Sequence, residues 1–280
     1  MRGVGVVVAA SIALSAQTTP PAAHCRPVGR PLFLPAVSEA SGIAQAGGAL
    51  WTHNDSGAPV LFRLDASGRT TAVTVNGAEV RDWEDLAGAP CSGAAQTSAR
   101  CLYVADIGDN RGSRERVTLY EVPVPATGAT STSPAVAVHA RYPDYPHDAE
   151  ALFISRTLGT IIITKEVPPR VYAFAASPKP GELNTLKLLR TLNERVRITG
   201  ASVSPDDRWV ALRSNNALFV YTAGEFAKGG DPVRVDLTSF KEPQGEGIAF
   251  GAGGELFLVS EGGGGDAAGV FMRIHCAFIR

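Results

Sequence analysis

The sequence predicts an all-β fold, a single β-propeller of five four-stranded blades, and two observations support this prediction. A short phrase recurs five times, as SEASGIA, DWEDLAG, DAEALFI, ITGASVS and QGEGIAF. Equivalent positions in successive copies are about 44, 66, 50 and 46 residues apart, close to the length of a propeller blade. The 280 residues also include 30 Gly and 19 Pro between short apolar segments, which is typical of strands joined by tight turns.

Alternation and β-branched content divide each of the first four repeats into four strands. The first repeat reads SGIAQA, ALWTHND, VLFRLD and TTAVTV, and the second reads DLAGA, LYVADIGDN, VTLYEV and AVAVHAR. The third reads EALFIS, TIIITKE, RVYAFAA and LKLLRTL, and the fourth reads ASVSP, WVALRSN, ALFVYTA and PVRVDL. Turn sequences such as SPDDRW, ASGR and AGGE separate strands within the repeats.

The last repeat is one strand short, which predicts how the ring closes. It offers GIAFGA, ELFLVSEG and GVFMRIH before the chain ends. We expect PLFLPAV, residues 31–37, to supply the missing outer strand and so to join the two ends of the propeller. The alternative is a sixth, irregular blade in the long second interval, where residues 121–147 include a stretch rich in Pro, Ser and Thr.

The N-terminal residues have the pattern of an export signal. An apolar stretch runs from Gly3 to Ala16 and ends in small residues, so we expect a signal peptide over 1–16, a spacer over 17–29 and the propeller domain over 30–280. The apolar stretch is too short to span a bilayer comfortably, and we expect no transmembrane segment. The sequence therefore predicts a secreted or cell-envelope protein. A lipid anchor on Cys25 is disfavoured because no small residue directly precedes it.

Four cysteines in an oxidising compartment allow three pairings. The strand assignment favours a bridge from Cys91 to Cys101 across one hairpin, which leaves Cys25 and Cys276 to join the two ends of the ring. Loop entropy makes the longer closure worth roughly 5 kcal/mol and the shorter one roughly 3 kcal/mol, before any strain.

Charge and motifs exclude several functions. The net charge is −1 and no basic run occurs, which argues against nucleic-acid binding. The sequence contains no GxSxG elbow, HExxH pair, Walker loop or GxGxxG followed by a helix. We expect a monomer with a small-molecule or protein ligand.

The recurrent phrase places polar groups at one mouth of the ring. In a propeller, the start of the innermost strand and the end of the second strand meet at the same face, so one rim collects both. Carboxylates crowd this rim, including Asp85 and Asp148. The candidates for ligand binding at this rim are Asn54, Asp55, Asp82, Asp106, Lys165, Arg213 and Glu261.

A hard divalent cation is one explanation for so many carboxylates. Calcium takes six to eight oxygen ligands from carboxylates, amides and backbone, and we expect an exported protein to meet it. The candidate metal ligands are Glu39, Glu84, Asp109, Asn110, Glu150 and Glu246, with Thr199 in place of a Glu in the fourth repeat. The alternative is a set of structural ion pairs with nearby basic residues: Arg81, Arg111, Lys165, Arg197 and Arg213.

His53 and His147 are the histidines expected at the rim. Either one beside a metal could act as a general base, because its pKa is near neutral pH. The alternative is that each is a hydrogen-bonded structural histidine.

The phrases SGIA, LWTHNDSG, DWEDLAG, YVADIGDNR, DAEAL, ITGASVSPD and GEGIAF resemble a family of exported bacterial β-propellers of unassigned function, common in actinobacteria. The resemblance covers about residues 31–261. More distantly, the architecture is similar to gluconolactonase and paraoxonase propellers, whose axial calcium assists ester or lactone hydrolysis, and to calcium-dependent propeller phytases. Residues of matching type here are Glu39, Asn54, Glu84, Asp109, Asn110, Glu150 and Glu246. Those enzymes have six blades, whereas this chain shows five repeats and Thr199 interrupts the acidic series.

Two functional hypotheses follow. The first is a propeller that binds a divalent cation together with a small polar or anionic ligand, or a protein partner, at the acidic mouth. The second is a calcium-dependent hydrolase of lactones or phosphate esters, with His53 or His147 handling the proton.

Overall fold

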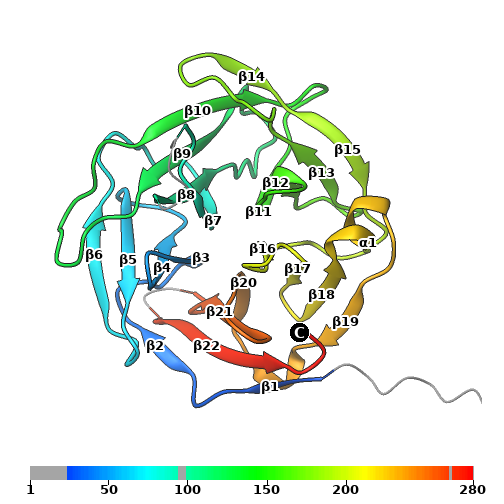
Figure 1. Cartoon of the computed structure of the whole chain (residues 1–280). Coiled ribbons are helices and arrows are strands. Elements are labelled where there is room, and N and C mark those ends of the chain that lie inside the picture. Colours follow the sequence, from blue (N-terminus) through cyan, green and yellow to red (C-terminus); the bar gives the residue numbers. More distant parts are fainter. Residues whose placement is uncertain (1–23, 94–98, 265–266, 280) are drawn as a thin grey trace, which may run out of the picture.

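A computed structural model of the chain describes residues 24–93, 99–264 and 267–279. Five sheets form a ring around one axis, which confirms the five-bladed β-propeller (Figure 1). The innermost strand of each blade lines the axis; these strands are β3 (Ala40–Ala46), β7 (Trp83–Pro90), β11 (Ala149–Ser155), β16 (Gly200–Val203) and β20 (Gln244–Phe250).

The outer strands follow in chain order, and the strands named in this paragraph pair antiparallel with their neighbours in the same blade. In the first blade they are β4 (Ala49–Asn54), β5 (Val60–Leu64) and β6 (Thr70–Thr74), and in the second β8 (Arg100–Asp106), β9 (Val117–Pro123) and β10 (Val136–Arg141). The third blade has β12 (Gly159–Thr164), β13 (Arg170–Ala173) and β15 (Lys187–Thr191), and the fourth has β17 (Trp209–Ser214), β18 (Ala217–Thr222) and β19 (Val233–Asp236). The fifth adds β21 (Glu255–Glu261) and β22 (Gly269–Cys276).

Two short elements decorate the outside of the ring. The strand β14 (Leu183–Thr185) runs parallel to β10 and adds a fifth strand to the second blade. The helix α1 (Ala223–Lys228) lies between β18 and β19; it begins at the N-cap Thr222 and ends at Gly229, whose positive φ of 76° closes the last turn.

The long second interval contains a loop and not a sixth blade. Between β9 and β10 the chain reaches back to the first blade, where the backbone N–H of Thr74 donates to Thr130 O and Thr132 N–H donates to Thr74 O. The side chain of Asn76 donates to Thr132 O as well. The Pro, Ser and Thr-rich stretch therefore extends the edge of β6 and links two neighbouring blades.

The N-terminal segment closes the ring as predicted. The strand β2 (Leu32–Leu34) pairs with β22, and so does β1 (Cys25–Pro27), which lies within the segment expected to be a spacer. Both run along the outer edge of β22 (Figure 1). The expected signal peptide, 1–16, and residues 17–23 lie outside the described residues. Within the part of the chain that the structure describes, no helix is long and apolar enough to cross a membrane.

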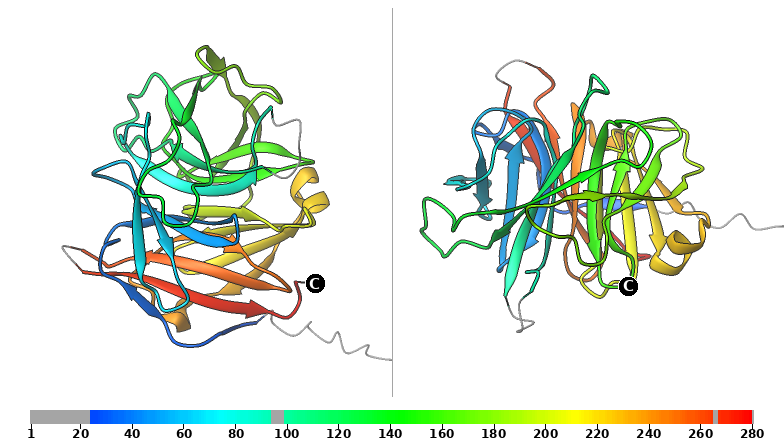
Figure 2. Two further views of the ribbon diagram at one scale, coloured as in Figure 1. Left: turned by 60° about the vertical axis from the view of Figure 1, so that its left-hand side comes forward. Right: turned by 90° about the horizontal axis from the view of Figure 1, so that it is seen from above.

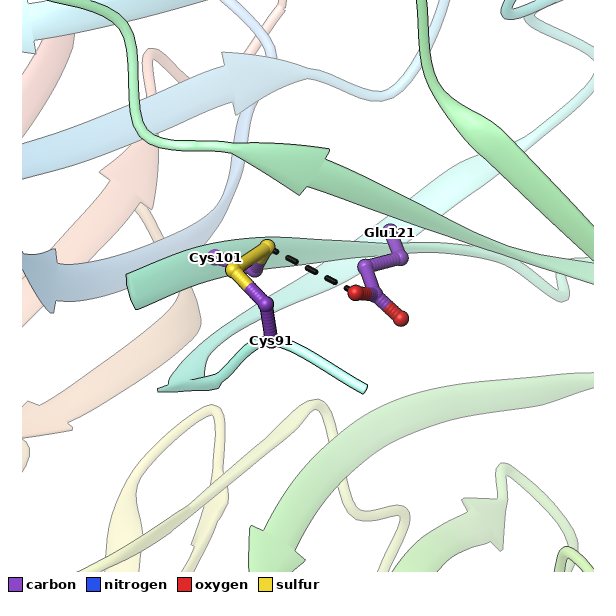
Figure 3. A group of neighbouring side chains, drawn as sticks. All are labelled: Cys91, Cys101 and Glu121. Atoms are coloured by element: carbon purple, nitrogen blue, oxygen red, sulfur yellow. Dashed lines mark hydrogen bonds between the residues drawn. A yellow bond between two sulfur atoms is a disulfide. The ribbon is translucent and has the colours of Figure 1, made fainter. Parts of the chain in front are cut away.

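Both predicted disulfides form. Cys25 pairs with Cys276 across 251 residues, and we call this the ring-closing disulfide. Cys91 pairs with Cys101 across the β7–β8 hairpin, and we call this the hairpin disulfide (Figure 3). Glu121 lies beside the hairpin disulfide, where its carboxylate accepts from the backbone and hydroxyl of Ser92.

Apolar side chains fill the space between successive blades. Five buried clusters each join two neighbouring blades, including the pair made by the last and the first. Trp83 is completely buried in the cluster between the first and second blades, where its indole N–H donates to Glu79 O. Burying an aliphatic or aromatic side chain of this kind contributes about 1.5–3 kcal/mol. The blades therefore pack against one another around the axis, and Figure 2 shows the same ring from two other directions.

Candidate axial cation site

β-Bulges place acidic residues at the start of the inner strands. The pairing of β7 with β8 shifts register around Glu84, and that of β11 with β12 shifts around Glu150. The β20–β21 pair shifts in the same way around Glu246. A bulge bends its strand and redirects a side chain, here at the mouth where inner strands begin. The three glutamates are buried, at 4–7% exposure.

The register shows which residues are equivalent in the other two blades. In the first blade the shift surrounds Ser41, so Ser41 and not Glu39 corresponds to the bulge glutamates. Glu39 is exposed and precedes β3. The β16–β17 pair of the fourth blade has no shift, and Thr199 donates through its hydroxyl to Gly245 O and Glu246 O. The acidic series thus has three bulge members.

Three carboxylates converge beside the axis, and we call Glu84, Asp148 and Glu150 the axial acid cluster. Each offers an oxygen, and these oxygens all lie within 4.8 Å of one another. Asp82 lies next to the cluster. Its Oδ2 and Glu84 Oε1 both lie close to Gly108, where a Cβ would overlap with the two oxygens. Only glycine at position 108 lets the backbone come so close to the two carboxylates.

One lysine neutralises part of this negative charge. Lys165 pairs with Glu150, and its Nζ lies 3.9 Å from Asp148 Oδ2. Glu84 differs from both: it is only 7% exposed, and among the described residues its carboxylate has no hydrogen-bond or ion-pair partner. A buried, unpartnered carboxylate is costly and must bind either a proton or a cation.

Burial and mutual repulsion disturb the titration of these groups. Burial raises the pKa of Glu84 well above its ordinary value, with further contributions from Glu150 and Asp82. Burial also raises the pKa of Glu150 to about 6, although Lys165 opposes the change. For Glu246, burial and the charge of Glu150 raise the pKa to about 8. Near neutral pH the site therefore favours whatever brings positive charge.

A second group of carboxylates lies farther out on the same mouth. Burial, and then Glu39 and Glu261, raise the pKa of Asp55 to about 7. The Glu39 carboxylate accepts from the Ser56 hydroxyl at 2.6 Å. Asn54 is used structurally, since its Oδ1 accepts from the backbone N–H of Glu39 at 3.1 Å. This outer group adds negative charge to the mouth.

The loop after β8 holds the cluster in place. Asp109 donates its backbone N–H to Asp148 Oδ1 at 2.7 Å, while its own carboxylate accepts from the backbone of Arg114. The buried Arg114 guanidinium pairs with Asp106 at 2.9 Å and donates to Gly108 O. Asp106 also accepts from the backbone N–H of Asp82. Asp106 and Asp109 therefore position Asp82 and Asp148, and Asn110 reaches Asp82 Oδ2 at 3.4 Å.

Arg213 is committed to a different internal pair. Its guanidinium donates to Gly247 O and Val259 O and pairs with Glu242 at 2.6 Å, and both side chains are almost fully buried. It joins the fourth blade to the fifth where the fourth lacks a bulge acid.

Asp85 joins three blades at the centre of the ring. It is completely buried, and its carboxylate accepts the backbone N–H groups of Leu86 at 2.8 Å, Leu152 at 2.7 Å and Ala201 at 3.1 Å. Burial still raises its pKa well above the ordinary value. The two adjacent acids in DWEDLAG thus have different tasks, because Glu84 lies in the bulge and Asp85 accepts backbone N–H groups from three inner strands.

The two histidines lie near the mouth but have no exposed ring. His53 is fully buried against Trp83, and burial lowers its pKa to about 4. The ring of His147 is also buried; its Nδ1 lies 2.5 Å from Glu166 Oε1, and its Nε2 lies 3.1 Å from Asp144 Oδ1 and 2.7 Å from the Tyr172 hydroxyl. Their role as general bases stays a prediction, and this placement favours a structural role.

Comparisons with known proteins agree with the architecture. No protein-family model matches the sequence, and no curated protein matches it. The PQQ-bound aldose sugar dehydrogenase of Streptomyces coelicolor is similar in structure, with a TM-score of 0.51 and 11% identity over 92% of this chain and 99% of that one. A gluconolactonase of Xanthomonas campestris has a TM-score of 0.46 and 12% identity over 90% and 98% of the two chains. At 11% identity, the similarity to the dehydrogenase shows the fold alone.

Proposed function

We propose that this protein binds a divalent cation, Ca²⁺, at the axial acid cluster and through it a small polar or anionic ligand or a side chain of a partner protein. The observation behind the proposal is Glu84, a nine-tenths-buried carboxylate with no partner among the described residues, beside two further carboxylates. Such a group is stabilised by a cation that neutralises it.

The donor set favours a hard cation. The cluster offers carboxylate oxygens only, the ligands preferred by Ca²⁺ and Mg²⁺, and Asp82 can add a fourth carboxylate. Ca²⁺ takes six to eight oxygen ligands in flexible geometry. When bound, it would neutralise the cluster and leave coordination positions for oxygen atoms of a ligand. Lys165 stands beside these positions and can pair with an anionic group.

Calcium titration by isothermal calorimetry tests the proposal. We expect wild-type protein, first treated with a chelator, to bind one Ca²⁺, and Glu84→Gln to bind it at least tenfold more weakly, because a neutral amide replaces a ligand charge. Glu246→Gln is the matched variant: Glu246 occupies the equivalent bulge but accepts from Gln244 at 2.9 Å, so we expect a smaller loss. The exposed Glu182→Gln is the neutral control. Wild-type protein that binds no Ca²⁺ would contradict the proposal.

We also propose binding rather than hydrolysis. A hydrolase with His53 or His147 as the base needs a ring nitrogen that reaches the ligand, and both rings are buried. Turnover screens with lactones and phosphomonoesters, with and without Ca²⁺, test this choice. Calcium-dependent turnover that is lost in His147→Ala would favour the hydrolase.

Export is part of the proposal. The two disulfides are consistent with an oxidising compartment, and an extracellular or cell-envelope location supplies Ca²⁺ at the level such a site needs. Detection of the mature protein outside the cytoplasm, with its N-terminus beyond residue 16, would support this part of the proposal.

A further inference from the structure

The end of the axis opposite the acidic mouth holds a cavity. Its volume is about 490 Å³, and residues at the far ends of the inner strands of all five blades line it. We call it the basic funnel and define it by Arg100 and Arg156 at its rim and by Ala46, Ala89, Val203 and Phe250 in its wall. We propose that the basic funnel binds a small amphipathic anion, with a carboxylate or phosphate monoester on an apolar body.

The two ends of the axis are separated. Leu86, Leu152 and Ala201 line the basic funnel, and their backbone N–H groups are the three that donate to Asp85. The buried Asp85 carboxylate and these segments of the inner strands therefore lie between the funnel and the acidic mouth. A ligand in the funnel does not need to touch the axial acid cluster.

The charge of the basic funnel favours an anion. Arg100 and Arg156 are both exposed, and among the described residues neither guanidinium has an acidic partner. Asp207 is the acid in the lining, and four donors already occupy its carboxylate: the Ser155 and Thr157 hydroxyls and the backbone N–H groups of Arg156 and Thr157. Two guanidiniums thus remain for a ligand, and each can bind a carboxylate or phosphate in bidentate fashion.

The backbone at both arginines is held firmly. Arg100 pairs with Pro90 in the β7–β8 ladder, next to the hairpin disulfide, and its carbonyl accepts from Val124 N–H at 3.1 Å. Arg156 is fixed by the hydrogen bond from its N–H to Asp207 Oδ1 at 3.1 Å. Anion-binding side chains on a rigid backbone lose less entropy on binding.

The wall of the funnel suits an apolar body. Alanine, valine and phenylalanine residues contribute to the lining of a space within the size range of small-molecule sites, about 300–1,000 Å³. An apolar chain of about eight carbons would contact this lining while its head group meets the arginines. A small inorganic anion would use the arginines but would make no contact with the apolar lining.

Binding of three eight-carbon probes tests the proposal: octanoate, octyl phosphate and neutral 1,2-octanediol, each measured by calorimetry on the full-length protein. We expect either anion to bind at least tenfold more tightly than the diol, and whichever anion binds more tightly identifies the preferred head group. The double variant Arg100→Gln/Arg156→Gln should lose at least tenfold in anion affinity, whereas the exposed Arg234→Gln should bind as wild type does.

Two further variants locate the binding. The exposed Gln45 also lines the funnel, so Gln45→Trp should obstruct it and weaken octanoate binding with both arginines in place. Glu84→Gln, at the other end of the axis, should leave octanoate binding unchanged. Equal binding of octanoate and diol, no binding by wild type at millimolar concentration, or unchanged octanoate binding in the double variant would each overturn the proposal.

Discussion

Replacing Lys165 with methionine should strengthen cation binding at the axial acid cluster. The lysine is a tethered cation that pairs with Glu150 and lies 3.9 Å from Asp148, the place where a metal would bind. It repels a metal and competes with it for both carboxylates. Methionine keeps an apolar stem of similar length and removes the charge.

The distance sets the size of the effect. Two unit charges about 4 Å apart interact by about 1 kcal/mol at the dielectric constant of water and by about 4 kcal/mol at an effective value of 20. A dication doubles the lower figure to about 2 kcal/mol. Because Lys165 is mostly buried, at 26% exposure, the figure for water is a minimum, and about 2 kcal/mol corresponds to at least about thirtyfold in Kd.

Calorimetric titration of wild type, Lys165→Met and the control Lys179→Met with Ca²⁺ measures this effect. Lys179 is exposed and pairs with Glu182, so its variant should bind as wild type does. In chelator at pH 8, Lys165→Met should melt below wild type, because Glu150 then loses its partner. Weaker Ca²⁺ binding by Lys165→Met would refute the reasoning and would make the lysine a partner of the bound ligand; equal binding would show that the metal lies elsewhere.

Three other predictions concern stability. Burial raises the folded-state pKa of Glu246 to about 8 and that of Asp55 to about 7, above their values in the unfolded chain. The folded state therefore binds more protons than the unfolded state between about pH 4.5 and 8, and it is destabilised as pH rises. The melting temperature in chelator should fall across this window and Ca²⁺ should restore it at pH 8, whereas a melting temperature that rises with pH would contradict these pKa assignments. Replacing both cysteines of the ring-closing disulfide with serine should cost about 5 kcal/mol in chemical unfolding, against about 3 kcal/mol for the hairpin disulfide, because the closed loops span 251 and 10 residues; equal losses would show that loop length does not decide. Asp85→Asn should lower the free energy of unfolding by about 1–3 kcal/mol and Asp85→Ala by more, because the backbone donors of three blades lose an acceptor. An unchanged unfolding midpoint in Asp85→Ala would show that Asp85 does not join the three blades.

Local sequence patterns were enough to predict the fold. The repeated phrase marks each inner strand, and alternation marks most of the outer ones. The missing strand of the last repeat, together with the positions of Cys25 and Cys276, predicted how the ring closes. These features depend on neighbours in the chain, or on the simple requirement that an edge strand be paired.

The side-chain arrangement at the mouth was predicted less well, for physical reasons. Glu39 and Ser41 are two residues apart, and only the position of the bulge shows which one matches Glu84. The sequence predicts Arg213 to be a basic residue available at the rim, yet its side chain is buried in an ion pair with Glu242, which lies 29 residues further along the chain. No motif in the sequence marks Arg114 as a site residue, although its guanidinium holds the loop that orients Asp148. Register shifts and long-range partners of this kind leave little local signal.

A crystal structure of the protein grown with Ca²⁺ tests the central claim most directly. We predict anomalous difference density for one ion, with oxygens of Glu84, Asp148 and Glu150 within about 2.3–2.6 Å of it. Its side-chain electron density should also show Lys165 turned away from Glu150. An ion bound elsewhere on the ring, or a cluster without an ion at millimolar Ca²⁺ and pH 8, would contradict the assignment of this mouth as a cation site.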